Sequence, residues 1–142
     1  MTRTALQRHP ESRGDAVRSI RIEVRREQAV IRVLYRVEGR LDRLQVPQPR
    51  APRFADGLWR HTCCEIFVAR DGSPAYHEFN FSPSGEWAAY AFSGYREGAL
   101  RDENVRPTIR MQTAEGVLGA VTFYFSSSSG EIVSTSPMLS NP

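Results

Sequence analysis

The stretch AYHEFNFSPSGEWAAYAF, at residues 75–92, decides the fold of this chain. Apolar and polar side chains alternate along 74–81 and again along 86–92, which is the two-residue period of a half-buried β-strand. Between these runs, Ser82-Pro83-Ser84-Gly85 places proline and glycine at the second and fourth positions of a type I turn. We therefore expect a β-hairpin in which Phe81 lies opposite Glu86.

A third strand is expected just before this hairpin, at residues 62–68 of the stretch LWRHTCCEIFV (58–68). The intervening Ala69-Arg70-Asp71-Gly72-Ser73-Pro74 has the composition of a turn. If this turn closes with Val68 opposite Ala75, Glu65 lies directly opposite Glu78. Three consecutive antiparallel strands then share two faces.

The expected register separates an apolar face from a polar one. The apolar face, which we expect to form the core, collects Cys64, Ile66, Val68, Ala75, His77, Phe79, Phe81, Ala88, Tyr90 and Phe92. The opposite face collects Cys63, Glu65, Phe67, Tyr76, Glu78, Asn80, Trp87, Ala89 and Ala91. Because side chains alternate with a period of two, a slip of one residue in either hairpin would exchange these faces locally.

The same period extends through the rest of the chain. Residues 20–24 and 31–37 alternate as a hairpin, a short strand is expected around 41–46, and further strands at 105–113 and 117–125. Residues 47–57 carry three prolines and predict a loop over a sheet edge or over a site. No window has helical spacing. We expect an all-β fold, an antiparallel β-sandwich of the immunoglobulin or jelly-roll type with about 8–10 strands and little helix.

The 142 residues fit one domain. Residues 1–16 are expected to form an N-terminal extension that is partly disordered, and 17–125 the β-sandwich. Residues 126–142 are rich in serine and predict a loosely attached tail.

Charge and composition argue against several classes of partner. All 19 cationic side chains are arginine, the net charge is +3, and the arginines are scattered among glutamates without a nucleic-acid-binding motif, so no nucleic acid is expected. No apolar run reaches the ~18 residues of a membrane span, and no secretory signal precedes the first strand, which predicts a cytoplasmic protein with no membrane partner. Cys63 and Cys64 are adjacent, so they cannot form a disulfide bond that links distant segments of the chain.

The polar face combines the residue types that bind a sugar. Carboxylates and an amide exchange hydrogen bonds with hydroxyl groups, and aromatic rings stack on the flat C–H faces of the ring. Two directly opposed glutamates also need an explanation, which an arginine, a bound cation, a shared proton or a ligand would each supply. Glycoside hydrolysis also uses paired carboxylates, but no third catalytic element is apparent. The alternative that loops simply cover this face stays open.

The central block resembles the DOMON-like proteins related to family 9 carbohydrate-binding modules. The resemblance rests on a tryptophan before an E-I-F strand and on the pattern Y-x-E-F-x-x-x-P-x-G before a strand that opens with an aromatic residue. Those positions are Trp59, Glu65-Ile66-Phe67, Tyr76, Glu78-Phe79, Pro83, Gly85 and Trp87. The similarity is sharp from about 47 to 98 and ends beyond Phe125.

The resemblance implies a β-sandwich that binds a ligand without transforming it, so we expect no enzyme activity. Its ligand would be a small molecule or oligosaccharide, preferably a carbohydrate. No cofactor is expected, although calcium and haem stay open, and a haem or redox domain and a protein-interaction domain, including a homodimer, are the alternatives. His61, Cys63, Cys64 and His77 match no zinc pattern. The implied ligand-binding residues are Trp59, Glu65, Tyr76, Glu78, Asn80 and Trp87.

Overall fold

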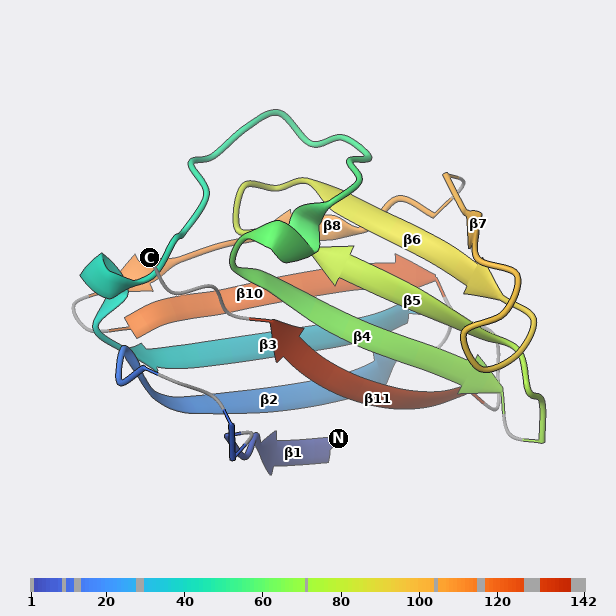
Figure 1. Cartoon of the computed structure of the whole chain (residues 1–142), viewed down its shortest axis with the longest axis horizontal. Coiled ribbons are helices and arrows are strands. Elements are labelled where there is room, and N and C mark those ends of the chain that lie inside the picture. Colours follow the sequence, from blue (N-terminus) through green and yellow to red (C-terminus); the bar gives the residue numbers. More distant parts are fainter. Residues whose placement is uncertain are drawn as a thin grey trace.

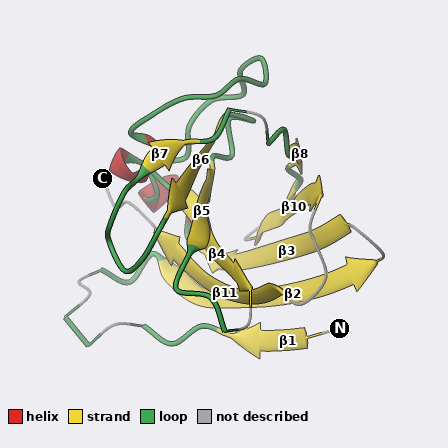
Figure 2. Cartoon of the chain, turned by 90° about the vertical axis from the view of Figure 1, so that its right-hand side faces the viewer, coloured by secondary structure: helices red, strands yellow, loops and turns green. Residues whose placement is uncertain are grey.

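Two antiparallel β-sheets pack face to face in the computed structural model, which confirms the predicted all-β sandwich (Figures 1 and 2). The structure describes residues 2–8, 10–11, 14–27, 30–70, 72–103, 105–114, 117–126 and 131–138. The first sheet has the order β1-β2-β3-β10-β8, with β9 paired to β10, and the second has the order β11-β4-β5-β6-β7. Their bounds are β1 Thr2–Ala5, β2 Val17–Glu27, β3 Val30–Gly39, β4 Cys63–Arg70, β5 Tyr76–Phe81, β6 Trp87–Phe92, β7 Leu100–Arg101, β8 Thr108–Arg110, β9 Thr113–Ala114, β10 Val117–Ser126 and β11 Glu131–Met138.

The core lies between the two sheets. The first sheet contributes the inward-facing residues of the predicted β2–β3 hairpin, and the second contributes those of β4, β5 and β6. Tyr35 is fully buried, and its hydroxyl donates a hydrogen bond of 2.9 Å to the backbone carbonyl of Glu65 across the sandwich. The buried cluster is Ile20, Ile22, Ile31, Val33, Tyr35, Val37, Cys64, Ile66, Val68, Phe79, Phe81, Trp87 and Ala89.

The turn between β5 and β6 is one residue longer than the sequence predicted. Gly85 N–H donates to Ser82 O, as in a type I turn, but Gly85 itself has a φ of 95° and Ser82 N–H donates to Glu86 O. This is the type I turn followed by a left-handed residue that forms a G1 bulge. Phe81 therefore lies opposite Trp87, not opposite Glu86 as predicted.

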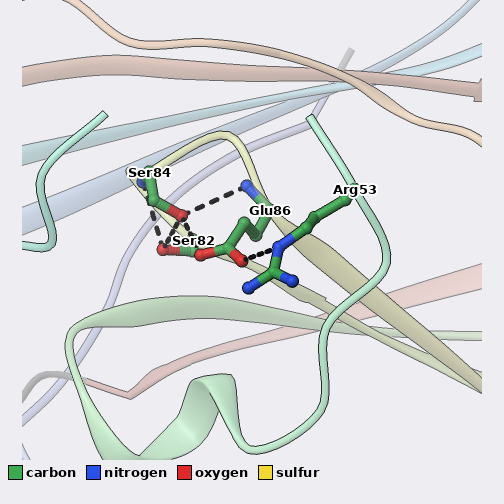
Figure 3. A network of polar contacts seen from close by, with 4 residues as sticks. All are labelled: Arg53, Ser82, Ser84 and Glu86. Carbon is green, nitrogen blue, oxygen red and sulfur yellow. Dashed lines mark hydrogen bonds and ion pairs between the residues drawn. The ribbon is translucent and has the colours of Figure 1, made fainter. Parts of the chain in front are cut away.

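Glu86 is held in this turn and not in the strand (Figure 3). Its carboxylate accepts hydrogen bonds from Ser84 Oγ at 3.0 Å and from Arg53 Nε at 2.7 Å, while its N–H donates to Ser84 Oγ at 3.2 Å. Ser82 Oγ lies 2.8 Å from Ser84 Oγ, within hydrogen-bond distance. Because Glu86 is buried and bonded on all these sides, β6 starts at Trp87.

The bulge exchanges the two faces of β6, so the predicted position of Trp87 on the polar face is wrong. Trp87 is only 9% exposed, packs in the core, and donates from Nε1 to Val105 O at 3.1 Å. Tyr90 and Phe92, expected in the core, lie instead opposite Glu78 and Tyr76 on the outer face.

The hairpin of β4 and β5 is shifted by two residues from the predicted register. Ala69 pairs with Tyr76 and Val68 with His77, so Glu65 lies opposite Asn80, and Phe67 opposite Glu78. The closing pair of the hairpin therefore lies one residue later on each strand than predicted. An even shift leaves each side chain on its predicted face, which is why the other polar-face assignments in β4 and β5 survive.

Five other segments differ from the sequence prediction. Residues 41–46 hold the 3-10 helix η1, Leu41–Arg43, where a strand was expected, and a second one, η2, spans Leu58–Arg60. The single strand expected at 105–113 is divided into β8 and β9. β1 extends the first sheet before residue 17, and β11 pairs with β4 in the expected loose tail. The prolines of 47–57 do form a loop along a sheet edge, where Arg53 and Ala55 bond to the backbone of Trp87.

We predict that Trp87→Ala lowers the free energy of unfolding by about 3–5 kcal/mol, as expected for a large core side chain. Trp59→Ala should change it by less than about 0.5 kcal/mol, because Trp59 is 53% exposed. Urea denaturation followed by circular dichroism measures both. Equal losses in the two variants would contradict the placement of Trp87 in the core.

Candidate functional site

The outer face of the second sheet gathers the polar and aromatic residues of β4, β5 and β6. We call this side of the sheet the carboxylate face. Cys63, Asn80 and Ala88 on it are buried, so its end near the turn between β5 and β6 is covered. Its side chains alternate with the core positions of the same strands, so the register alone brings them together. The carboxylate face consists of Cys63, Glu65, Phe67, Tyr76, Glu78, Asn80, Ala88, Tyr90 and Phe92.

Glu65 and Glu78 form a coupled carboxyl pair at the centre of this face. They are diagonal neighbours on β4 and β5, since Glu78 lies two residues from Asn80, the partner of Glu65. Burial, and then the hydrogen bond and negative charge of Glu78, raise the pKa of Glu65 to about 8. Glu65 is therefore protonated at neutral pH.

Asn80 extends the pair into a polar trio. Its Nδ2 donates to Glu78 Oε1 at 3.3 Å. Its Oδ1 is buried and has no hydrogen-bond partner within the described part of the chain. Since an unpartnered buried amide oxygen is costly, it identifies this position as a candidate for function.

Three aromatic side chains lie together on the same face, toward the turn that joins β4 to β5. The rings of Tyr76 and Phe92 stack with centroids 4.7 Å apart and planes 8° apart, and Phe67 meets Tyr76 edge-on at 6.0 Å. The Tyr76 hydroxyl accepts a hydrogen bond of 3.1 Å from the backbone N–H of Arg96. All three rings are only half-buried, so they offer apolar area beside the polar trio.

The proline-rich loop is tied to the border of this face at Tyr90. The Tyr90 hydroxyl donates to Asp56 Oδ1 at 2.6 Å, and Arg101 forms an ion pair with the same carboxylate. The Arg101 guanidinium also lies 5.3 Å from the ring centroid of Phe54. Burial, and then the charge of Glu78, raises the pKa of Tyr90. Sequence reasoning missed this border because it placed Tyr90 in the core.

Of the six predicted ligand-binding residues, Glu65, Tyr76, Glu78 and Asn80 share the carboxylate face. Trp59 lies on η2, which contacts β5, and the Arg60 guanidinium lies 5.4 Å from the centroid of its ring. Trp87 belongs to the core and cannot contact a ligand on this face. Phe92 is an aromatic residue that the prediction missed, and the glycine at the fourth turn position was the available signal for the bulge that exposes it.

The thiols and the histidines do not extend the site. Cys63 and Cys64 are both free and buried. Burial raises the pKa of Cys63 to about 12 and that of Cys64 higher still, so neither is a thiolate nucleophile at neutral pH. His77 contacts Asp102 Oδ2 at 3.2 Å, outside the carboxylate face. Within the described residues, no group of three or more histidines, cysteines and acids could hold a metal ion.

Comparison of the chain with known protein families, with curated proteins and with solved structures found no match. Among the described residues, no helix has the length and hydrophobicity needed to cross a membrane.

The carboxyl pair predicts a specific dependence of stability on pH. The folded pKa of Glu65 lies above its ordinary value of 4.5, so between these values the folded state binds more protons than the unfolded state. The free energy of unfolding should therefore fall as the pH rises from about 5 to about 8. After solvent screening, we expect a loss of about 1–2 kcal/mol.

Glu65→Gln should remove most of this slope, because the amide retains a donor to Glu78 and does not ionise. Urea denaturation at several pH values measures the slope, and Glu103→Gln, an exposed site outside the face, is the control. A slope that persists in Glu65→Gln would contradict the assignment.

Proposed function

We propose that this protein binds a neutral carbohydrate on the carboxylate face without transforming it. One observation carries the proposal: the hydrogen-bonding trio of Glu65, Glu78 and Asn80 lies next to the stacked rings of Tyr76 and Phe92 on a single sheet face. A sugar presents both matching surfaces, hydroxyl groups at its rim and C–H bonds on its faces.

The protonation of the pair suits a ligand that both donates and accepts hydrogen bonds. Protonated Glu65 is a donor, the carboxyl oxygens of Glu78 are acceptors, and the unpartnered Oδ1 of Asn80 is a further acceptor. Trp59, exposed on η2, is a candidate for an additional stacking contact. Because each aromatic contact adds only about 0.5–1.5 kcal/mol beyond burial, we expect dissociation constants between roughly micromolar and millimolar.

The separation of the two carboxyl groups favours binding over glycoside hydrolysis. Glycosidases hold their two carboxyl groups at least about 5 Å apart, with the sugar between them. Here the Glu65 carboxyl group is hydrogen-bonded to Glu78, which leaves no space for a sugar between them. The resemblance to family 9 carbohydrate-binding modules supports the same proposal, although Trp87, one of the residues that carry it, has a structural role.

Calorimetric titration with a panel of neutral mono- and oligosaccharides at pH 6.5 tests this proposal. We expect one ligand class to bind, and Tyr76→Ala and Glu78→Gln each to weaken its affinity by about tenfold, which corresponds to about 1.4 kcal/mol. Tyr95→Ala and Glu103→Gln, at exposed positions outside the face, should bind as the wild type does.

Two results would count against the proposal. One is the absence of binding across the panel. The other is the release of reducing sugars by the wild type together with its loss in Glu78→Gln, which would favour a hydrolase.

A further inference from the structure

The outer face of the first sheet carries a concentration of arginines that the proposed function does not use. The second sheet covers only one side of β2 and β3 (Figure 2). The side chains on their other side alternate with the core residues, and the register extends this face to β1 and to β8. We call it the arginine face. Its charged residues are Arg3, Arg21, Glu23, Arg25, Glu27, Arg32, Arg36, Glu38 and Arg110.

Two pairs of arginines lie directly opposite each other on this face. Arg21 is paired in register with Arg36, and Arg25 with Arg32. Directly opposed strand residues have their Cβ atoms only about 5 Å apart, and like charges at such positions destabilise a sheet. The sequence thus places repulsion twice in one hairpin.

The carboxylates on the face offset only part of this charge. Glu23 accepts from Arg25 at 2.6 Å and from Arg3 at 3.0 Å, while Glu38 pairs with Arg18 at 3.2 Å and with Arg36 at 3.6 Å. The hydrogen bonds from Arg25 and Arg18 are the main reason that the pKa values of Glu23 and Glu38, respectively, are lowered.

The arginine face therefore keeps a net positive charge. Six arginines face three glutamates, and within the described part of the chain neither Arg21 nor Arg110 forms a salt bridge with a carboxylate.

The arginine face also contains a groove at the position of the Arg21–Arg36 pair. A groove of about 500 Å³ runs over β1, β2 and β3. Arg3, Arg21 and Arg36 line it, together with Thr4, Ala5, Ile22, Glu23 and Leu34. Arg21 and Arg36 are both exposed, so their guanidinium groups are accessible to an anion from solvent.

We propose that the arginine face binds a linear acidic polysaccharide that carries sulfate or carboxylate groups. Guanidinium groups form paired hydrogen bonds with such anions, and each opposed pair of arginines gains a shared counter-charge. The two pairs lie four residues apart along the strands, or about 13 Å. An extended polymer with repeated charges reaches both pairs, whereas a single small anion reaches one.

The described surface favours this polymer over two other polyanions. Proteins that bind single-stranded nucleic acid stack successive bases on several aromatic side chains, whereas the register of the described strands places one aromatic residue, Tyr124, on this face. Peripheral membrane binding commonly adds an apolar anchor, and Val30 is the only large, strongly exposed apolar side chain described in this sheet.

Titration with a size-defined heparin octasaccharide tests the proposal. We expect the wild type to bind, with an affinity that falls as NaCl is raised from about 50 to about 200 mM. Arg21→Gln/Arg36→Gln should bind at least about tenfold more weakly and with a shallower dependence on salt, because fewer charges are neutralised. Arg50→Gln/Arg96→Gln, which removes the same charge from exposed positions elsewhere, should bind as the wild type does.

A stability measurement separates lost binding from lost folding. Removing Arg21 and Arg36 relieves a repulsion, so the urea midpoint of the variant should equal or exceed that of the wild type. Arg25→Gln/Arg32→Gln provides an independent second variant, with the same expected loss of heparin affinity.

Three results would overturn the proposal: no binding of heparin by the wild type, equal losses in the control variant, or tighter binding of single-stranded DNA or phosphatidylserine vesicles than of heparin at equal salt. Because Tyr76→Ala leaves this face unchanged, it should retain heparin binding, so failure of either proposal can be recognised separately.

Discussion

The position of the bulge at Gly85 controls which side chains of β6 face the core. Gly85 adopts a φ of 95°, a conformation that glycine tolerates better than other residues, and a Cβ there would also lie 3.4 Å from Arg50 O. The extra residue sets Phe81 opposite Trp87. As a result, Trp87 packs in the core, while Tyr90 and Phe92 lie on the outer face with Glu65 and Glu78. Glu86 stabilises the same register, because Arg53 and Ser84 hold it in the turn.

The proline-rich loop completes the second sheet as well as bordering its outer face. The backbone of Arg53 and Ala55 bonds to Trp87, and the N–H of Asp102 donates to Ala89 O, so separate segments cover the edge of β6. Covered edges cannot pair with other chains. Asp56, in the same loop, then fixes Tyr90 at the border of the carboxylate face. The loop therefore couples the protection of the sheet edge to the shape of the candidate site.

The two outer faces of the sandwich have opposite chemistry and handle their charge differently. On the carboxylate face, two acids come together and a proton resolves their repulsion, as the raised pKa of Glu65 indicates. Arginine cannot lose its proton near neutral pH, so the opposed arginines of the other face have no equivalent solution. Their charge is offset by neighbouring glutamates in part, and an external anion is the remaining source of compensation. The same physical problem thus underlies both proposals, a neutral ligand on one face and an acidic ligand on the other.

The sequence by itself determined the fold class, the β2–β3 hairpin and the alternation within β4 and β5, because a period of two depends only on neighbouring residues. It also placed Glu65, Tyr76, Glu78 and Asn80 on one face, since the two-residue shift in that hairpin preserved parity. The faces of β6 depended on the bulge, for which Gly85 is the local signal, and on the contact of Glu86 with Arg53, 33 residues away, which arises only in the folded chain. The edge position of β11 depended on the pairing of Glu131 with Arg70. Contacts between residues so distant in the chain leave no periodic signal in the local sequence.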